Sequence, residues 1–120
     1  MLDYFRTLYK CKFIMFPLIL VGPLFVVISL LTLLFPPKRI NGLYGYRTKR
    51  SMSNQKAWDS AQKISSQIMF LEGVIMSLFA GLGFLFSLTE GLEVGLSLTV
   101  LVSGIVFLFV YTEKKIKDLK

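Results

Sequence analysis

Three long stretches of this 120-residue chain are almost entirely apolar, and charged residues gather between them and near the two ends. Residues 13–35 and 94–111 hold no charged side chain, and residues 64–88 hold one. A helix of about 20 residues crosses the roughly 30 Å hydrocarbon core of a bilayer. Each stretch is long enough to do so, and the pattern therefore predicts three transmembrane helices.

The first apolar stretch has a competing interpretation as a cleaved signal peptide. It is far longer than the apolar region of such a peptide, and no small-x-small cleavage site follows it. We therefore expect a retained first helix and an all-α integral membrane protein with three transmembrane helices. The predicted parts are an N-terminal segment (1–12), the first helix (13–35), a basic connector (36–63), the second helix (64–88), a turn (89–93), the third helix (94–111) and a basic tail (112–120).

The connector combines a turn with the start of a helix. Asn41 and Gly42 form a dipeptide typical of turns. Ser51 or Ser53 can cap a new helix, and no helix breaker follows between Asn54 and the second apolar stretch. We therefore expect the second helix to begin before the membrane, near Asn54. Three aromatic rings of this region suit the headgroup zone of a bilayer: Tyr44, Tyr46 and Trp58.

Basic residues are distributed unevenly over the segments outside the apolar stretches. The connector and the tail together carry eleven of the fourteen Lys and Arg residues, and the N-terminal segment carries the other three. Short segments rich in Lys and Arg stay in the cytoplasm, so we expect the N-terminus outside and the connector and C-terminus inside. The net charge of +7 then points to anionic lipid headgroups as the partner, rather than to nucleic acid.

Small residues recur every four positions in and near the second and third helices. Such stripes permit close packing in a bilayer, where apolar burial does not drive helices together. Because the turn between these helices is short, they are antiparallel neighbours, and we expect the two stripes to face each other. A homo-oligomer is the alternative use of such stripes. The stripe of the second helix consists of Gly73, Ser77 and Gly81, and the stripe of the third helix consists of Gly91, Gly95, Thr99 and Ser103.

Residues that commonly carry catalysis are sparse. The chain has no histidine and one cysteine, Cys11, which excludes His-based catalysis, the usual zinc sites and an intramolecular disulfide. The polar candidates for a nucleophile or base are scattered along the chain: Ser51, Ser53, Asp59, Ser65 and Ser66. We therefore expect no enzyme activity, no cofactor and no metal site.

Glu72 is the one charged residue of the second apolar stretch. An ionisable residue inside a membrane is a functional candidate by default. The alternative is that Glu72 lies shallow and reaches a basic residue of the connector, or that it stays protonated. Both interpretations remain open. Glu72 alone does not make a proton relay, and no second acid or base within the spans completes one.

The order of residues in the connector is specific. Residues 41–58 read NGLYGYRTKRSMSNQKAW. This run resembles the signature of the SdpI family of small bacterial membrane proteins, in which a proline-ended helix is followed by the same pattern. The tail, TEKKIKDLK, is similar to the Thr-Glu-Lys-rich ending of that family. The residues that match the signature are Asn41, Tyr44, Gly45, Tyr46, Arg47, Thr48, Ser51, Met52, Asn54 and Trp58.

The resemblance implies an immunity function at the bacterial plasma membrane. The family is named for a protein that protects a cell from a secreted toxin peptide and that also holds a transcriptional repressor at the membrane. Two departures matter: this chain resembles the family core alone, and it carries Ser53 and Gln55 where relatives tend to carry a basic and an acidic residue. We therefore expect protection, by binding a toxin peptide or shielding the membrane, and we do not expect repressor capture.

Two other functions remain as alternatives. Three helices with a basic cytoplasmic tail also fit a holin-like pore-forming protein, although a patterned connector is foreign to that class. A small transporter or accessory subunit would use Glu72, but it would need paired intramembrane charges or repeated halves, and the sequence has neither.

Overall fold

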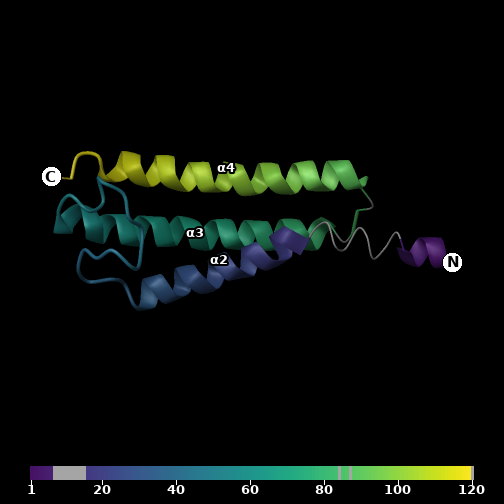
Figure 1. Ribbon diagram of the computed structural model, residues 1–120, viewed down its shortest axis with the longest axis horizontal. Coiled ribbons are helices and arrows are strands. Elements are labelled where there is room, and N and C mark those ends of the chain that lie inside the picture. Colours follow the sequence, from purple (N-terminus) through teal and green to yellow (C-terminus); the bar gives the residue numbers. More distant parts are fainter. Residues whose placement is uncertain (7–15, 84, 87, 120) are drawn as a thin grey trace.

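The computed structural model describes residues 1–6, 16–83, 85–86 and 88–119. Three long helices dominate this part of the chain: α2 (Phe16–Leu34), α3 (Gln55–Gly83) and α4 (Glu90–Ile116). A short helix covers residues 2–6, and the described residues contain no strand. The three long helices lie side by side along the length of the molecule, with the C-terminal end at one extremity and residues 1–6 at the other (Figure 1). The expected all-α architecture is confirmed.

The helix bounds follow the apolar stretches with informative differences. α3 and α4 are each long and apolar enough to cross a membrane, and Leu18–Leu34 forms a shorter apolar helix. Residues 13–15 of the first predicted span lie outside the described residues. α4 continues past the predicted end at residue 111 to Ile116, because its last turns carry polar residues with no helix breaker among them.

α3 begins where the sequence indicates, but a different residue caps it. Asn54 Oδ1 accepts the backbone N–H of Ala57 at 2.8 Å, which is the capping bond of a helix start. The expectation that Ser51 or Ser53 caps this helix is wrong. Ser53 donates instead to the carbonyl of Arg50, and the Ser51 hydroxyl is used inside the preceding turn. The segment between α2 and α3, residues 35–54, is called the connector loop below.

α2 and α3 approach each other closely at two glycines. A Cβ on Gly73 would lie 2.8 Å from the carbonyl oxygen of Gly22 and 2.8 Å from the backbone nitrogen of Val26. A Cβ on Gly22 would lie 2.8 Å from the backbone nitrogen of Ser77. Only glycine fits such a contact, so Gly73 and Ser77 lie at the surface of α3 that faces α2. Leu18 and Met76 are fully or almost fully buried in this part of the bundle.

The expectation that the stripes of α3 and α4 face each other is therefore wrong. A Cβ on Gly81, Gly91 or Gly95 would meet nothing within 4 Å. α4 approaches α3 through Gly104 instead, where an added Cβ would lie 3.1 Å from Met76 Cε. Four-residue spacing identifies the positions that share a helix face, but it does not identify the neighbour. The α4 residues that complete the stripe, Thr99 and Ser103, are exposed and donate to carbonyls of their own helix.

Candidate functional site

The connector loop starts with a turn that Asn41 stabilises. The Oδ1 atom of Asn41 accepts the backbone N–H groups of Leu43 at 3.0 Å and Tyr44 at 2.8 Å. An Asn side chain in this arrangement replaces a backbone turn. The hydroxyl of Tyr44 then donates to the carbonyl of Phe35 at 3.1 Å, next to the end of α2. The first part of the motif thus folds back onto the helix that precedes it.

The loop next attaches to α3 through a pair of reciprocal hydrogen bonds. The backbone N–H of Tyr46 donates to Gln62 Oε1 at 2.7 Å, and Gln62 Nε2 donates to the Tyr46 carbonyl at 2.8 Å. Gln62 is 3% exposed, so an unpaired amide there would be costly. Gly45 has a φ of 103°, and an added Cβ would collide with the Gln62 amide and come within 3.0 Å of Pro37 Cγ. Glycine is required here by both conformation and space.

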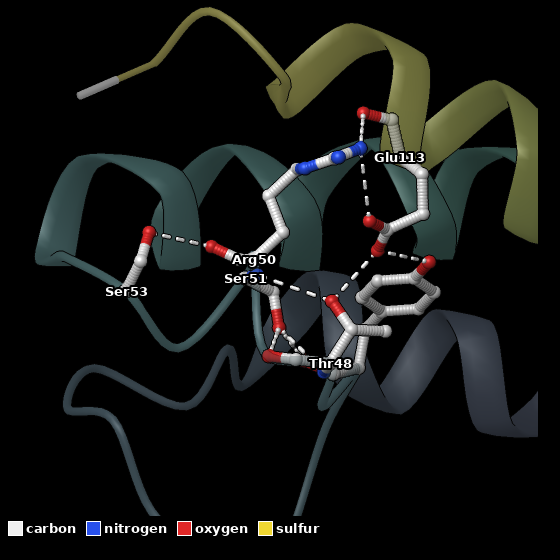
Figure 2. A network of polar contacts seen from close by, with 6 residues as sticks. Thr48, Arg50, Ser51, Ser53 and Glu113 are labelled. Atoms are coloured by element: carbon white, nitrogen blue, oxygen red, sulfur yellow. Dashed lines mark hydrogen bonds and ion pairs between the residues drawn. The ribbon is translucent and has the colours of Figure 1, made fainter.

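Glu113 of α4 is the acceptor for three side chains of the connector loop. Its Oε1 atom accepts hydrogen bonds from the Tyr46 hydroxyl at 3.0 Å and the Thr48 hydroxyl at 2.6 Å. Arg50 Nη1 lies 3.3 Å from Glu113 Oε2 and donates to the Glu113 carbonyl at 3.1 Å. Figure 2 shows Thr48 and Arg50 converging on Glu113 from the loop. One carboxylate therefore joins the loop to the far end of the chain.

Ser51 shapes the turn that presents these side chains. Its hydroxyl accepts the backbone N–H of Thr48 at 2.8 Å and lies 3.1 Å from the carbonyls of Tyr46 and Thr48. The backbone N–H of Ser51 donates in turn to the Thr48 hydroxyl at 3.1 Å (Figure 2). Ser51 is fully buried. Its role is to hold the turn in one conformation.

Trp58 and Asn54 tie the start of α3 to its surroundings. Trp58 Nε1 donates to the carbonyl of Pro37 at 2.7 Å, and Asn54 Nδ2 donates to the carbonyl of Leu119 at 3.1 Å. Trp58 is 0% exposed, so the expectation that its ring sits half wetted among lipid headgroups is wrong. The Pro37 carbonyl follows the end of α2 and has no helical partner, and the indole N–H satisfies it.

The Tyr46 phenol is kept protonated by its environment. Burial raises the pKa of Tyr46 most, and the hydrogen bond to the Glu113 carboxylate and the negative charge of that group raise it further, against a smaller opposite effect of Arg50. A neutral phenol donates a hydrogen bond to a carboxylate, whereas a phenolate beside a carboxylate is repelled. Tyr46 is thus a fixed donor in this network.

Arg47 and Glu72 share no hydrogen bond or ion pair in the described part of the chain, so they do not form one site. Glu72 is 8% exposed, and neither of its carboxylate oxygens has a hydrogen-bond partner in the described part of the chain. It packs against α4, where a Cβ on Gly104 would lie 3.5 Å from Glu72 Cδ. The interpretation in which Glu72 reaches a basic residue of the connector is wrong. Arg47 is exposed and makes no ion pair within the residues that the structure describes.

Most of the motif is therefore structural. Each of its polar side chains except Arg47 donates or accepts a hydrogen bond inside the protein. Sequence reasoning missed the two partners that complete it, Gln62 and Glu113. Glu113 had one signal, the Thr-Glu-Lys ending of the tail, but Gln62 had none. Within the described residues, no group of three Asp, Glu, His or Cys side chains could hold a metal ion.

Comparisons with known proteins place the loop sequence in a known family. The model of the SdpI/YfhL protein family matches residues 38–112, which include the whole loop motif. A relative from Bacillus subtilis (strain 168), described as "Uncharacterized protein YfhL", is 43% identical over 96 residues, which cover 80% of this chain and 82% of the relative. No solved structure matches the chain. The chain belongs to the SdpI/YfhL protein family.

Proposed function

We propose that this protein spans the bacterial plasma membrane three times and protects its cell against a membrane-active toxin peptide. In this arrangement the N-terminus is outside, and the connector loop and the tail are in the cytoplasm. The distribution of Lys and Arg supports the orientation. The hydrogen bonds from Thr48 to Glu113 and from Asn54 to Leu119 support it too, because they bring loop and tail to one end of the bundle.

The network at Glu113 is the observation that favours a binding or shielding role over catalysis. Tyr46, Thr48 and Arg50 use their polar groups to hold α4, and they leave no activated nucleophile in the loop. Most apolar side chains of α4 are exposed, so in a bilayer they face lipid. A toxin peptide that inserts in the bilayer would meet this surface of α4, and the loop would fix the position of α4.

The test is survival of a deletion strain that carries the gene on a plasmid. Cells with the wild-type gene are expected to survive secreted membrane-active peptides better than cells with Glu113→Ala. Asp118→Asn is the matched control, because Asp118 is an exposed carboxylate of the same tail. If deletion leaves survival unchanged for every peptide tested, with the protein normally present in the parent, the protective role is excluded.

The three-span topology has its own test. Lys49→Cys and Lys117→Cys, each in a Cys11→Ser background, are expected to react with a membrane-impermeant thiol reagent only after the cells are opened. Labelling of one site in intact cells and of the other only in opened cells would contradict the arrangement.

Glu72 supports a second candidate, a coupling or accessory role in transport. A buried carboxylate without a partner inside an apolar helix is costly and is retained where it functions. If Glu72→Gln abolishes protection while the amount of folded protein is unchanged, the ionisable carboxyl group is part of the mechanism. Unchanged protection would assign Glu72 no such role.

A further inference from the structure

A groove of about 450 Å³ lies between α2, α3 and α4 and is covered at one end by the connector loop. α2 and α4 both pack on α3 and make little contact with each other. The space between them is therefore open on the side away from α3. Its volume is within the range of sites for small molecules, about 300–1,000 Å³.

The groove changes from apolar to polar along its length. Its apolar walls come from Phe25 and Ile28 of α2, Met69 of α3 and Ile105 of α4. Thr32 lies one to two turns nearer the end of α2 than Ile28 and Phe25 do, and Ser66 lies nearer the start of α3 than Met69 does. The connector loop joins these two helix ends. The polar end is thus the end at the connector loop, and the apolar end points along the helices. An amphiphile with a polar head and an apolar tail matches this order.

Arg47 supplies a free positive charge at the polar end. It lines the groove and is exposed, and no carboxylate in the described residues pairs with it. Arg50, three residues later, is paired with Glu113 and lies outside the groove. A guanidinium binds phosphate through two parallel hydrogen bonds. The charge and position of Arg47 therefore suit a phosphate group at the surface of the bilayer.

We propose that the groove binds one anionic phospholipid, with an acyl chain along Phe25, Ile28 and Met69 and the phosphate on Arg47. A peptide segment fits less well, because its backbone N–H and C=O groups need partners in an apolar environment. The hydroxyls of Thr32 and Ser66 are already bonded to each other at 2.7 Å, and the Gln62 amide is bonded to Tyr46. An acyl chain needs no such partners. This site does not depend on the protective function proposed above.

The experiment uses the whole protein, purified in an uncharged detergent. Phosphatidylglycerol or phosphatidylcholine is added, and bound lipid is measured by native mass spectrometry with the unfolding temperature as a second readout. The variant is Arg47→Gln, and the matched control is Lys49→Gln, which removes an exposed cation outside the groove. We expect Arg47→Gln to bind phosphatidylglycerol about tenfold more weakly than wild type, since it loses a charge-assisted hydrogen bond. The control is expected to bind as wild type does.

A second variant tests the groove itself. Ile105→Trp places a larger side chain in the groove at a position that is 40% exposed, so the fold can accommodate it. It is expected to lower the binding of both lipids. The proposal is overturned if Arg47→Gln and Lys49→Gln bind phosphatidylglycerol equally, or if lipid retention is unchanged in Ile105→Trp. Loss of protection in Ile105→Trp with unchanged lipid retention would assign the groove to the peptide instead. Because binding is measured on purified protein, a failure of the protective function leaves this result intact.

Discussion

The Thr48 hydroxyl donates a 2.6 Å hydrogen bond to the carboxylate of Glu113, so the connector loop and α4 meet at one charged group. Tyr46 and Arg50 contact the same carboxylate. The ion pair with Arg50 is partly exposed and contributes little by itself. The two hydroxyl donors make the contact specific, and they make the position of α4 depend on the loop.

Removal of the Glu113 carboxylate is expected to loosen the loop. In Glu113→Ala, Tyr46 and Thr48 lose a charged acceptor, and we expect a loss of about 2 kcal/mol in the free energy of unfolding. Unfolding in a denaturing detergent, followed by helical circular dichroism, measures it. Asp118→Asn is expected to unfold as wild type does, and equal losses in both variants would show that the network has no special role.

Alkaline pH is expected to destabilise the protein through Tyr46. Burial and then the hydrogen bond to Glu113 raise its pKa above the ordinary value of 10.0. The folded protein thus holds the phenol proton more tightly than the unfolded chain does. The contribution of Tyr46 to the free energy of unfolding is therefore fully present below about pH 10. Above about pH 10 it falls by about 1.4 kcal/mol per pH unit.

Tyr46→Phe isolates this effect from the other tyrosines. The variant is expected to be about 1 kcal/mol less stable than wild type near neutral pH, because one hydrogen bond is lost. The free energy of unfolding of Tyr46→Phe should fall less between about pH 8 and about pH 11 than that of wild type does. Parallel stability curves for the two proteins would contradict a buried, proton-donating Tyr46.

Gly45 and Gly42 are a matched pair in one loop. Gly45→Ala forces a side chain into a left-handed backbone conformation and against Gln62, and we expect a cost of about 1–3 kcal/mol. Gly42→Ala meets nothing within 4 Å, and its stability is expected to stay within about 0.5 kcal/mol of wild type. Thermal unfolding followed by the fluorescence of Trp58 distinguishes the two. An equal effect would mean that the loop adopts another conformation.

Gly73 and Gly95 make the same comparison for helix packing. Gly73→Ala pushes α2 and α3 apart, because the new Cβ would lie 2.8 Å from Gly22 and Val26 backbone atoms, and we expect a loss of about 1–3 kcal/mol. Gly95→Ala has open space, and alanine is the better helix former, so no loss is expected. Both variants are measured by unfolding in a denaturing detergent. A larger loss of stability in Gly95→Ala than in Gly73→Ala would instead support packing of the α4 stripe against α3, as the sequence predicts.

The helices could be predicted from sequence because they depend on local properties. The length of an apolar stretch and the position of turn residues decide where a helix runs, and Asn54 marks the start of α3 closely. The neighbours of each helix could not be predicted in the same way. Gly73 has the same spacing relations whether it faces α2 or α4, and only the packed structure shows the contact with Gly22.

The site was predictable in its residues and not in their roles. The connector motif stands out in the sequence, but its polar and aromatic residues fit a binding surface as well as an internal network. The hydrogen bonds to Glu113 and Gln62 show that the motif forms an internal network. Both residues are distant from their partners along the chain, so the sequence does not reveal these bonds. Within the described residues, Arg47 makes no ion pair, whereas Arg50 pairs with Glu113. No local sequence pattern distinguishes these two arginines.

The distance between Thr48 and Glu113 along the chain also bears on how the protein is made. A ribosome releases the chain from its N-terminus onward, and Glu113 follows Thr48 by 65 residues. The loop therefore lacks this acceptor until the last helix has been synthesised. A product that stops before Glu113 keeps a loop that is attached to α3 through Gln62 but not to α4, and proteases are expected to cut such a loop more readily.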